Sequence, residues 1–302
     1  MGIFAVSTAS ILIRFAQREA ASLAVAAWRI VIAGLLIAPF AIRKNRNEIK
    51  GLGKGDLLWL GLSGVCLALH FASWITSLEY TTVAASVVLV TTTPLWVALF
   101  SVVVYGEKFP RNLVIGLFLS LLGGGIVGVG EEVCHFEQSH LVCQNFPSLM
   151  GGNPMLGNLL ALAGAFCAAA YLLIGKKLRS KLSLWTYTFL VYGTAGLLLL
   201  MMAVGAGKKM WGFSPFTYLI LFSLALIPQV IGHSSFNWAL RYLSTTYVSI
   251  ALLGEPIGST VLAILFLSEI PSELVIFGGI LILLGIYIAT KAPVQREGAQ
   301  PE

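Results

Sequence analysis

Two ionisable side chains of opposite charge lie deep inside long apolar stretches of this chain. Arg29 is about nine residues into one stretch, and Glu255 is about ten residues into another. At 1.5 Å per helical residue, each lies about 12–15 Å from the nearer end of its stretch. Charges at that depth in a bilayer are costly, so Arg29 is a candidate to bind a carboxylate and Glu255 to bind an ammonium group or a proton. Structural alternatives stay open: Arg29 caps main-chain carbonyls or pairs with Glu255, and Glu255 is protonated and hydrogen-bonded.

Uncharged polar groups extend this set of candidates. His70 shares a helical face with Trp74 at a spacing of four residues, and Gln229, His233 and Asn237 form a polar stripe at the same spacing. Amide and imidazole groups inside a membrane need water, a substrate or another helix as partner. We therefore predict that they line a cavity, although a single histidine is also a common core residue.

Aromatic residues complete the predicted substrate-binding set with Trp28, Tyr171 and Tyr192. These are weaker candidates, because aromatic side chains also form the core and the interfacial belts of membrane proteins. Residues 91–93 are threonines that precede Pro94. Their hydroxyls can satisfy main-chain groups freed by the proline, so we expect a local structural role for them.

The composition shows which class of protein positions these groups. Hydrophobic residues make up 58% of the 302 residues and charged residues 11%, with a mean hydropathy of +0.89. Such values exclude an ordinary soluble protein and indicate a multi-pass membrane protein. The net charge of +6 does not indicate nucleic-acid binding, because the basic residues lie in short loops and no nucleic-acid motif is present. We also expect no cleavable signal, since the first apolar stretch lacks a preceding basic region and a cleavage site.

Ten segments are apolar enough to be read as transmembrane helices, and in lipid only helices are plausible spans here. We therefore predict an all-α integral membrane protein. The predicted helices cover residues 2–17, 21–42, 56–78, 82–105, 111–130, 155–175, 183–205, 215–240, 245–267 and 272–291.

A constant offset of 162 residues relates the two halves of the chain. It aligns "GEKFP" at 106–110 with "SEIPS" at 268–272, and it aligns helix prolines and glycines without a gap. The aligned pairs are Glu107 with Glu269, Pro94 with Pro256, Gly116 with Gly278, Gly123 with Gly285, and Gly34 with Gly196. Five spans in each copy give the second copy inverted topology, with a site expected near the midplane between the halves.

These boundaries divide the chain into a first repeat at 1–130, an inter-repeat loop at 131–154, a second repeat at 155–291 and a tail at 292–302. Most lysines and arginines fall on one side of the predicted membrane, and only Arg14, Arg18, Lys208 and Lys209 flank the other. The positive-inside rule then places both termini in the cytoplasm and the 131–154 loop outside.

The inter-repeat loop holds Cys134 and Cys143, for which we expect a disulfide on an oxidising face; two free thiols are the alternative. Metal binding by this loop is disfavoured, because its cysteine and histidine spacing matches no standard zinc pattern. The "GGGIVG" at 123–128 satisfies a dinucleotide-binding pattern but lies inside a predicted span, where small residues such as Gly124 and Gly128 favour helix packing. No catalytic motif is present, so we expect neither enzymatic activity nor a cofactor.

Two segments carry a resemblance to a known family. "SLEYTTVAASVVLVTTTPLWVALFSVVVYGEKF" and "ALRYLSTTYVSIALLGEPIGSTVLAILFLSEI" resemble the two copies of the EamA domain, which belongs to the drug/metabolite transporter (DMT) superfamily. The resemblance covers nearly the whole chain apart from the 131–154 loop and the tail. It implies ten helices in two inverted repeats, a central cavity and alternating access. It also implies export of amino acids or other small metabolites, as in the YddG-like exporters.

We therefore predict a secondary transporter in the cell (inner) membrane that exports small metabolites such as amino acids, related zwitterions or amines, with protons as a possible coupling ion. Pro94, Pro256, Glu107 and Glu269 are assigned structural or gating roles. One alternative is a sugar-phosphate or nucleotide-sugar carrier, which would need several cations facing the cavity. The other is a non-transporting scaffold or lipid-handling protein, which would have a dry, packed centre.

Overall fold

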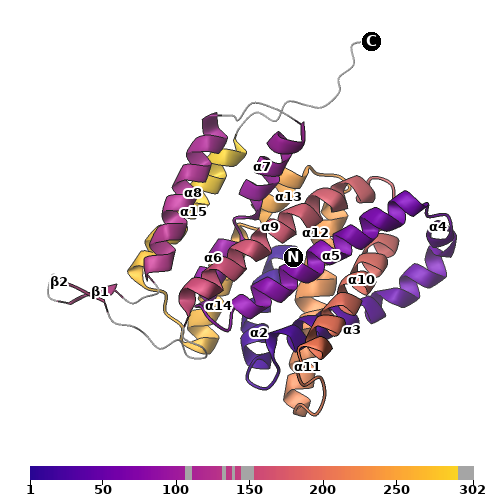
Figure 1. The fold of residues 1–302 in the computed structure, drawn as a ribbon, viewed down its shortest axis with the longest axis horizontal. Coiled ribbons are helices and arrows are strands. Elements are labelled where there is room, and N and C mark those ends of the chain that lie inside the picture. The colour runs from indigo at the N-terminus through magenta and orange to yellow at the C-terminus, as the bar shows by residue number, and fades with distance from the viewer. Residues whose placement is uncertain (106–110, 131–133, 138–139, 144–152, 292–302) are drawn as a thin grey trace, which may run out of the picture.

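The computed structural model of the chain describes residues 1–105, 111–130, 134–137, 140–143 and 153–291, and it is almost entirely helical (Figure 1). Glu107 and the 292–302 tail lie outside the described residues. The helices of the first half are α1 Gly2–Ser7, α2 Ala9–Ala16, α3 Ser22–Lys44, α4 Arg46–Lys50, α5 Lys54–Ser77, α6 Val83–Val90, α7 Thr93–Tyr105 and α8 Arg111–Gly130. Those of the second half are α9 Pro154–Arg179, α10 Leu184–Gly205, α11 Pro215–Leu224, η1 Ala225–His233, α12 Ser234–Ala239, α13 Thr245–Ala251, α14 Gly254–Leu267 and α15 Glu273–Thr290.

Seven helical segments in the described residues are long and apolar enough to cross a membrane. Three shorter apolar helices span Gly2–Ala16, Arg111–Val127 and Glu273–Ala289. Large side chains such as Leu58, Phe118, Leu219 and Leu265 are exposed on the outside of the bundle, as expected for a lipid-facing surface. The chain is therefore a multi-pass, all-helical membrane protein, while the number of ten spans stays a prediction.

Glutamates from other segments cap several helix N-termini. The first N–H groups of a helix have no partner within it, and a carboxylate there also interacts favourably with the helix dipole. The N–H to carboxylate bonds in the described residues are Ser22 to Glu79 at 3.0 Å, Val83 to Glu269 at 2.9 Å, Ser183 to Glu48 at 2.6 Å and Ser214 to Glu19 at 2.8 Å.

Helices α8 and α15 run side by side at one edge of the molecule (Figure 1) and approach through glycines. A Cβ built on Gly123 would lie 2.6 Å from the carbonyl oxygen of Gly278, and one built on Gly278 would lie 2.6 Å from the oxygen of Gly123. Gly116 and Gly285 meet in the same way. The sequence pattern singled out Gly124 for packing, but a Cβ built on Gly124 would lie 3.7 Å from Leu89 Cδ2, which is an ordinary contact distance, so the close approach uses Gly123 instead.

These glycine contacts are reciprocal under the 162-residue offset. Gly116 corresponds to Gly278 and Gly123 to Gly285, so each glycine meets the counterpart of its partner. A two-fold relation between two antiparallel halves requires this reciprocity. If Gly123 contacts Gly278, then their counterparts, Gly285 and Gly116, must contact each other as well. The repeat boundaries themselves stay a prediction.

Two spans are broken at positions that match to within one residue under the offset. Residues 91–92 form a turn between α6 and α7, and residues 252–253 form a turn between α13 and α14. Pro94 and Pro256 lie just inside the second half-helix in each case, where a missing main-chain N–H is tolerated. The breaks therefore follow from the paired prolines.

The span predicted at 215–240 is not one regular helix. Its middle, η1, is a π-helix that contains Pro228. A proline inside a helix removes one main-chain donor and clashes with the preceding turn, and π segments accommodate such disruptions. The change in periodicity alters which side chains share a face.

A short hairpin lies in the inter-repeat loop. Strands β1 Cys134–Glu137 and β2 His140–Cys143 pair antiparallel, with Cys134 opposite Cys143 in the register. The side chains of both cysteines lie outside the described part of the chain, so the predicted disulfide stays a prediction.

Candidate functional site

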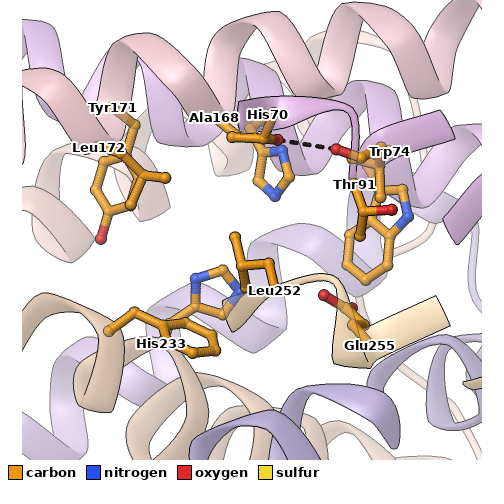
Figure 2. A pocket seen from close by; sticks show the side chains of 12 residues that line it. His70, Trp74, Thr91, Ala168, Tyr171, Leu172, His233, Leu252 and Glu255 are labelled. Atoms are coloured by element: carbon orange, nitrogen blue, oxygen red, sulfur yellow. Dashed lines mark hydrogen bonds between the residues drawn. The ribbon is translucent and has the colours of Figure 1, made fainter. Parts of the chain in front are cut away.

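A cavity of about 50 Å³ lies between the two helix breaks, which is room for a few water molecules. Figure 2 shows Tyr171, Leu172 and Ala168 of α9 on one side and His233, Leu252 and Glu255 across from them. The lining residues are His70, Trp74, Val90, Thr91, Thr93, Ala168, Tyr171, Leu172, His233, Phe236, Leu252 and Glu255.

The two breaks place three polar side chains and one apolar side chain on the cavity wall. Thr91 and Thr93 come from the first break, and Leu252 and Glu255 come from the second. The threonine hydroxyls donate to main-chain carbonyls of α6, just before the break, including Thr93 Oγ1 to Val90 O at 2.8 Å. This agrees with the local role expected for them, and it also places them on the cavity wall.

Helix α5 contributes two rings. His70 Nδ1 lies 2.9 Å from the carbonyl oxygen of Gly164 on α9, and because a carbonyl only accepts, this nitrogen carries the hydrogen. In a neutral ring, Nε2 is then left as an acceptor. The ring stacks on Trp74 at 5.9 Å between centroids and lies 6.4 Å from the ring of His233.

Glu255 supplies the carboxylate of the cavity. Its side chain is 8% exposed and lies in the first turn of α14. Within the described residues, no basic nitrogen lies within 4.0 Å of its oxygens. The predicted alternative of an Arg29–Glu255 ion pair is therefore not formed here.

Arg29 lies behind the cavity wall, fully buried. Its Nε donates to Gln229 Oε1 at 2.9 Å, and its guanidinium lies over the Phe71 ring at 4.3 Å and 5.9 Å from the Trp74 ring. The other alternative, a cap on main-chain carbonyls, is likewise not what these contacts show.

Of the three predicted aromatic residues that remain, one lines the cavity and two do not. Tyr171 lines the cavity, and its hydroxyl donates to Asn237 Oδ1 at 2.7 Å. Tyr192 is buried with its hydroxyl 3.5 Å from Ser234 Oγ. Trp28 lies away from the cavity, where its Nε1 donates to Met210 O at 2.9 Å.

The predicted stripe on η1 and α12 is split by the π-helix. His233 faces the cavity, whereas Gln229 binds Arg29 and Asn237 binds Tyr171 behind the wall. Sequence reasoning also missed apolar lining residues, among them Leu252 and Phe236. The repeat held a signal for part of this set, because Phe236 aligns with the predicted Trp74.

Basic side chains make matching contacts at the two ends of the bundle. At one end Arg14 forms an ion pair with Glu269 at 3.0 Å and donates to Thr81 O at 3.0 Å. At the other end Lys176 donates to Leu243 O at 2.9 Å. Arg14 aligns with Lys176 and Thr81 with Leu243 under the offset, so the two main-chain contacts are equivalent.

In comparison with known proteins, one family model matches nearly the whole chain. The model of the EamA-like transporter family matches residues 1–129 and 155–291. An uncharacterized transporter of Archaeoglobus fulgidus is 26% identical over 285 residues, covering 93% of this chain and 91% of that protein. The uncharacterized transporter YdfC of Bacillus subtilis is 25% identical and covers 68% of this chain and 62% of that protein.

One solved crystal structure superposes with a TM-score of 0.65 at 17% sequence identity. It covers 96% of this chain and 93% of the other. At this identity the likeness concerns the fold alone.

Proposed function

This chain belongs to the EamA-like transporter family, and from that premise we propose that it is a secondary transporter of small metabolites, most closely amino acids and related zwitterions or amines. The observation that carries the proposal is a polar cavity placed between two broken helices at equivalent positions of the halves. Broken helices at a repeat interface are the usual place for substrate sites in transporters of this kind. Alternating access would then open the cavity to each side in turn.

The lining residues favour a small substrate with at most one strong charge. His70, His233 and Glu255 line the cavity, and its described lining contains no lysine or arginine. A sugar-phosphate or nucleotide-sugar carrier needs several cations to hold a phosphate group. The alternative of a dry, packed scaffold is disfavoured, because polar groups face an open space at the centre.

We further propose that Glu255 takes part in energy coupling, binding either a substrate ammonium group or a proton. Its carboxylate faces the cavity without a basic partner in the described residues. Its counterpart in the other half is Thr93, so the two halves are not equivalent at this position.

Membrane placement and export direction belong to the same proposal. Most basic residues of the chain lie at one side of the predicted spans, which supports cytoplasmic termini in a cell membrane. A tag inserted at residue 140 and a tag at the C-terminus should be detected in opposite compartments. Detection of both tags in one compartment would rule out the inverted arrangement of the halves.

Transport by purified protein in proteoliposomes tests the function. We expect counterflow of labelled amino acids from a mixed panel, with at least about a tenfold loss of rate in Glu255→Gln, since one charged contact is worth about 1.5–3 kcal/mol. Glu273→Gln, which changes an exposed glutamate at the start of α15, is the matched control. Absence of counterflow for every amino acid, amine, sugar and nucleotide tried would contradict a transport function.

A further inference from the structure

Two arginines are fully buried among the residues that the structure describes, and their hydrogen bonding differs. Arg179 donates through Nε to Asn237 O at 2.9 Å and through Nη1 to Leu182 O. Arg29 donates through Nε to Gln229 alone. Its Nη1 and Nη2 are shielded from solvent and have no hydrogen-bond partner in the part of the chain that the structure describes.

Buried charged donors without acceptors are strongly unfavourable, so this arrangement needs an explanation. Two neighbours of Arg29 also have buried donor groups that lack an acceptor. Gln229 Nε2 and Trp74 Nε1 are also buried without a hydrogen-bond partner among the described residues. Gln229 is bonded to Arg29, and the Trp74 ring lies 5.9 Å from the guanidinium.

All the unpaired groups of this cluster are hydrogen-bond donors. A guanidinium, a side-chain amide nitrogen and an indole nitrogen donate and do not accept. Whatever completes the cluster must therefore bring acceptor oxygens. Water supplies acceptors too, but it does not neutralise the charge of a buried arginine.

The charge of the cluster selects among oxyanions. One arginine provides a single positive charge and a planar pair of donors, which suits a planar carboxylate. Glu255 lies on the cavity side and interacts electrostatically with Arg29. A carboxylate carries one negative charge, which balances the single positive charge of Arg29. A phosphate ester carries a second negative charge, which no lysine or arginine of the described cavity lining offsets and which Glu255 repels.

We propose that Arg29, Gln229 and Trp74 form a carboxylate subsite, closed in this conformation, that opens to the cavity when the rings of Phe71 and Trp74 move aside. Trp74 lines the cavity and its ring also lies next to the guanidinium of Arg29, so its displacement would connect the cavity with the cluster. The proposal rests on the transport function above and specifies its substrate class: a carboxylate is required, and an ammonium group is not.

The three side chains come from helices α3, α5 and η1, which pack against one another. Their counterparts in the other half are Val191, Phe236 and Leu67, none of which offers a hydrogen-bond donor from its side chain. The subsite therefore occurs once in the molecule, on one side of the pseudo-symmetric centre, as an oriented substrate requires.

Thermal stabilisation of the purified full-length protein tests the subsite, because a bound ligand raises apparent stability by mass action. The probes are four compounds of matched shape: L-leucine, 4-methylpentanoate, L-leucinamide and 3-methylbutylamine. The corresponding set built on phenylalanine covers a larger side chain, and glucose 6-phosphate covers the phosphate case. We expect a concentration-dependent rise in Tm with both carboxylates of each set and none with the amide, the amine or the phosphate ester.

Substitutions test whether carboxylates bind at this cluster. Arg29→Met should weaken carboxylate binding at least about tenfold, Arg29→Lys should weaken it less, and Trp74→Phe, which keeps a ring but removes the N–H, should lie between them. Arg179→Lys is the matched control, since it alters the other buried arginine. It should lower Tm without ligand and leave the preference for carboxylates unchanged.

The outcomes separate this inference from the transport proposal. Equal stabilisation by amides or amines, no stabilisation by any carboxylate, or unchanged carboxylate binding in Arg29→Lys and Trp74→Phe would each overturn the subsite. Counterflow without carboxylate preference would leave transport standing and remove the subsite. Carboxylate-specific stabilisation without counterflow would support the subsite and contradict the transport function. If Arg29→Met does not fold, Arg29→Lys and Trp74→Phe decide.

Discussion

At the scale of single residues, four glutamates of the described residues accept hydrogen bonds from the start of a helix in another segment. Glu48 illustrates this: it accepts hydrogen bonds from Ser183 N at 2.6 Å, Ser183 Oγ at 2.5 Å and Thr186 Oγ1 at 2.6 Å at the start of α10. It lies on α4, so one carboxylate ties the end of α3 to the start of α10. Partial burial raises the pKa of Glu48, but these hydrogen bonds and one from Asn45 outweigh that effect and leave the pKa below its ordinary value.

A pH dependence of stability follows from Glu48. Because its pKa is lower in the folded protein than in the unfolded chain, its stabilisation is present at neutral pH and is lost as pH falls through the folded value. Glu48→Gln should lower stability at pH 7 by about 1 kcal/mol, the usual effect of losing a helix cap. Its Tm should also fall less steeply than that of the wild type between about pH 6 and pH 3.5.

Thermal melts across that pH range measure the effect. Asp56→Asn is the control, since no hydrogen bond in the described residues reaches that carboxylate. Parallel pH profiles for the wild type and Glu48→Gln would show that Glu48 is not the group responsible.

At the scale of elements, glycines determine how the helices cross. Gly123 allows α8 to reach the main chain of α15, while Gly125, two residues further on, has no atom within 4 Å of the position of a Cβ. The same helix therefore offers a tight position and an open one.

Gly123→Ala should destabilise the protein by about 1–3 kcal/mol, because the new methyl group would lie 2.6 Å from the Gly278 oxygen and 2.9 Å from Ile282 and would force the helices apart. Gly125→Ala should be neutral or slightly stabilising, because alanine has the higher helix propensity. Melting temperatures of the two variants in one detergent compare them directly. Equal Tm values would mean that the α8–α15 contact is not tight.

At the scale of the whole molecule, one end is held by an ion pair that joins the two halves. Arg14 of α2 pairs with Glu269, which also caps α6 through Val83 N. Ser268, before Glu269, has φ 55° and is the only non-glycine residue with positive φ among the described residues. This left-handed conformation ends α14 and precedes the carboxylate.

Glu269→Gln should favour opening of this end, because the pair is largely buried and is worth about 1 kcal/mol, or about a fivefold change in population. A single cysteine at the cavity residue Ala168, in a background without other cysteines, reports access to a membrane-impermeant thiol reagent. Labelling from the Arg14 side should accelerate about fivefold in Glu269→Gln and stay unchanged in Glu273→Gln. Identical labelling rates in the two variants would remove the gating role of Glu269.

The sequence by itself determined the class of protein and the positions of its helices. Apolar stretches predicted the helical segments to within a few residues, because this signal depends only on neighbouring residues. The breaks beside Pro94 and Pro256 were not predicted, since 82–105 and 245–267 were each expected to form one continuous helix. The 162-residue offset aligned Gly116 with Gly278 and Gly123 with Gly285, but it did not predict which of these glycines touch; the contacts of Gly116 with Gly285 and of Gly123 with Gly278 came from the structure. The family resemblance, first drawn from two segments, was confirmed by the match over both halves, although the YddG-like subtype stays a prediction.

Only the tertiary structure decided which polar groups meet. Arg29 and Gln229 are 200 residues apart, and their contact depends on how α3 packs against η1. The spacing had predicted that Gln229, His233 and Asn237 line one wall of the cavity. Because the segment around Pro228 is a π-helix, His233 faces the cavity whereas Gln229 binds Arg29. Helical periodicity is a local property, whereas the partner of a buried charge depends on packing between distant segments, which the spacing of residues does not contain.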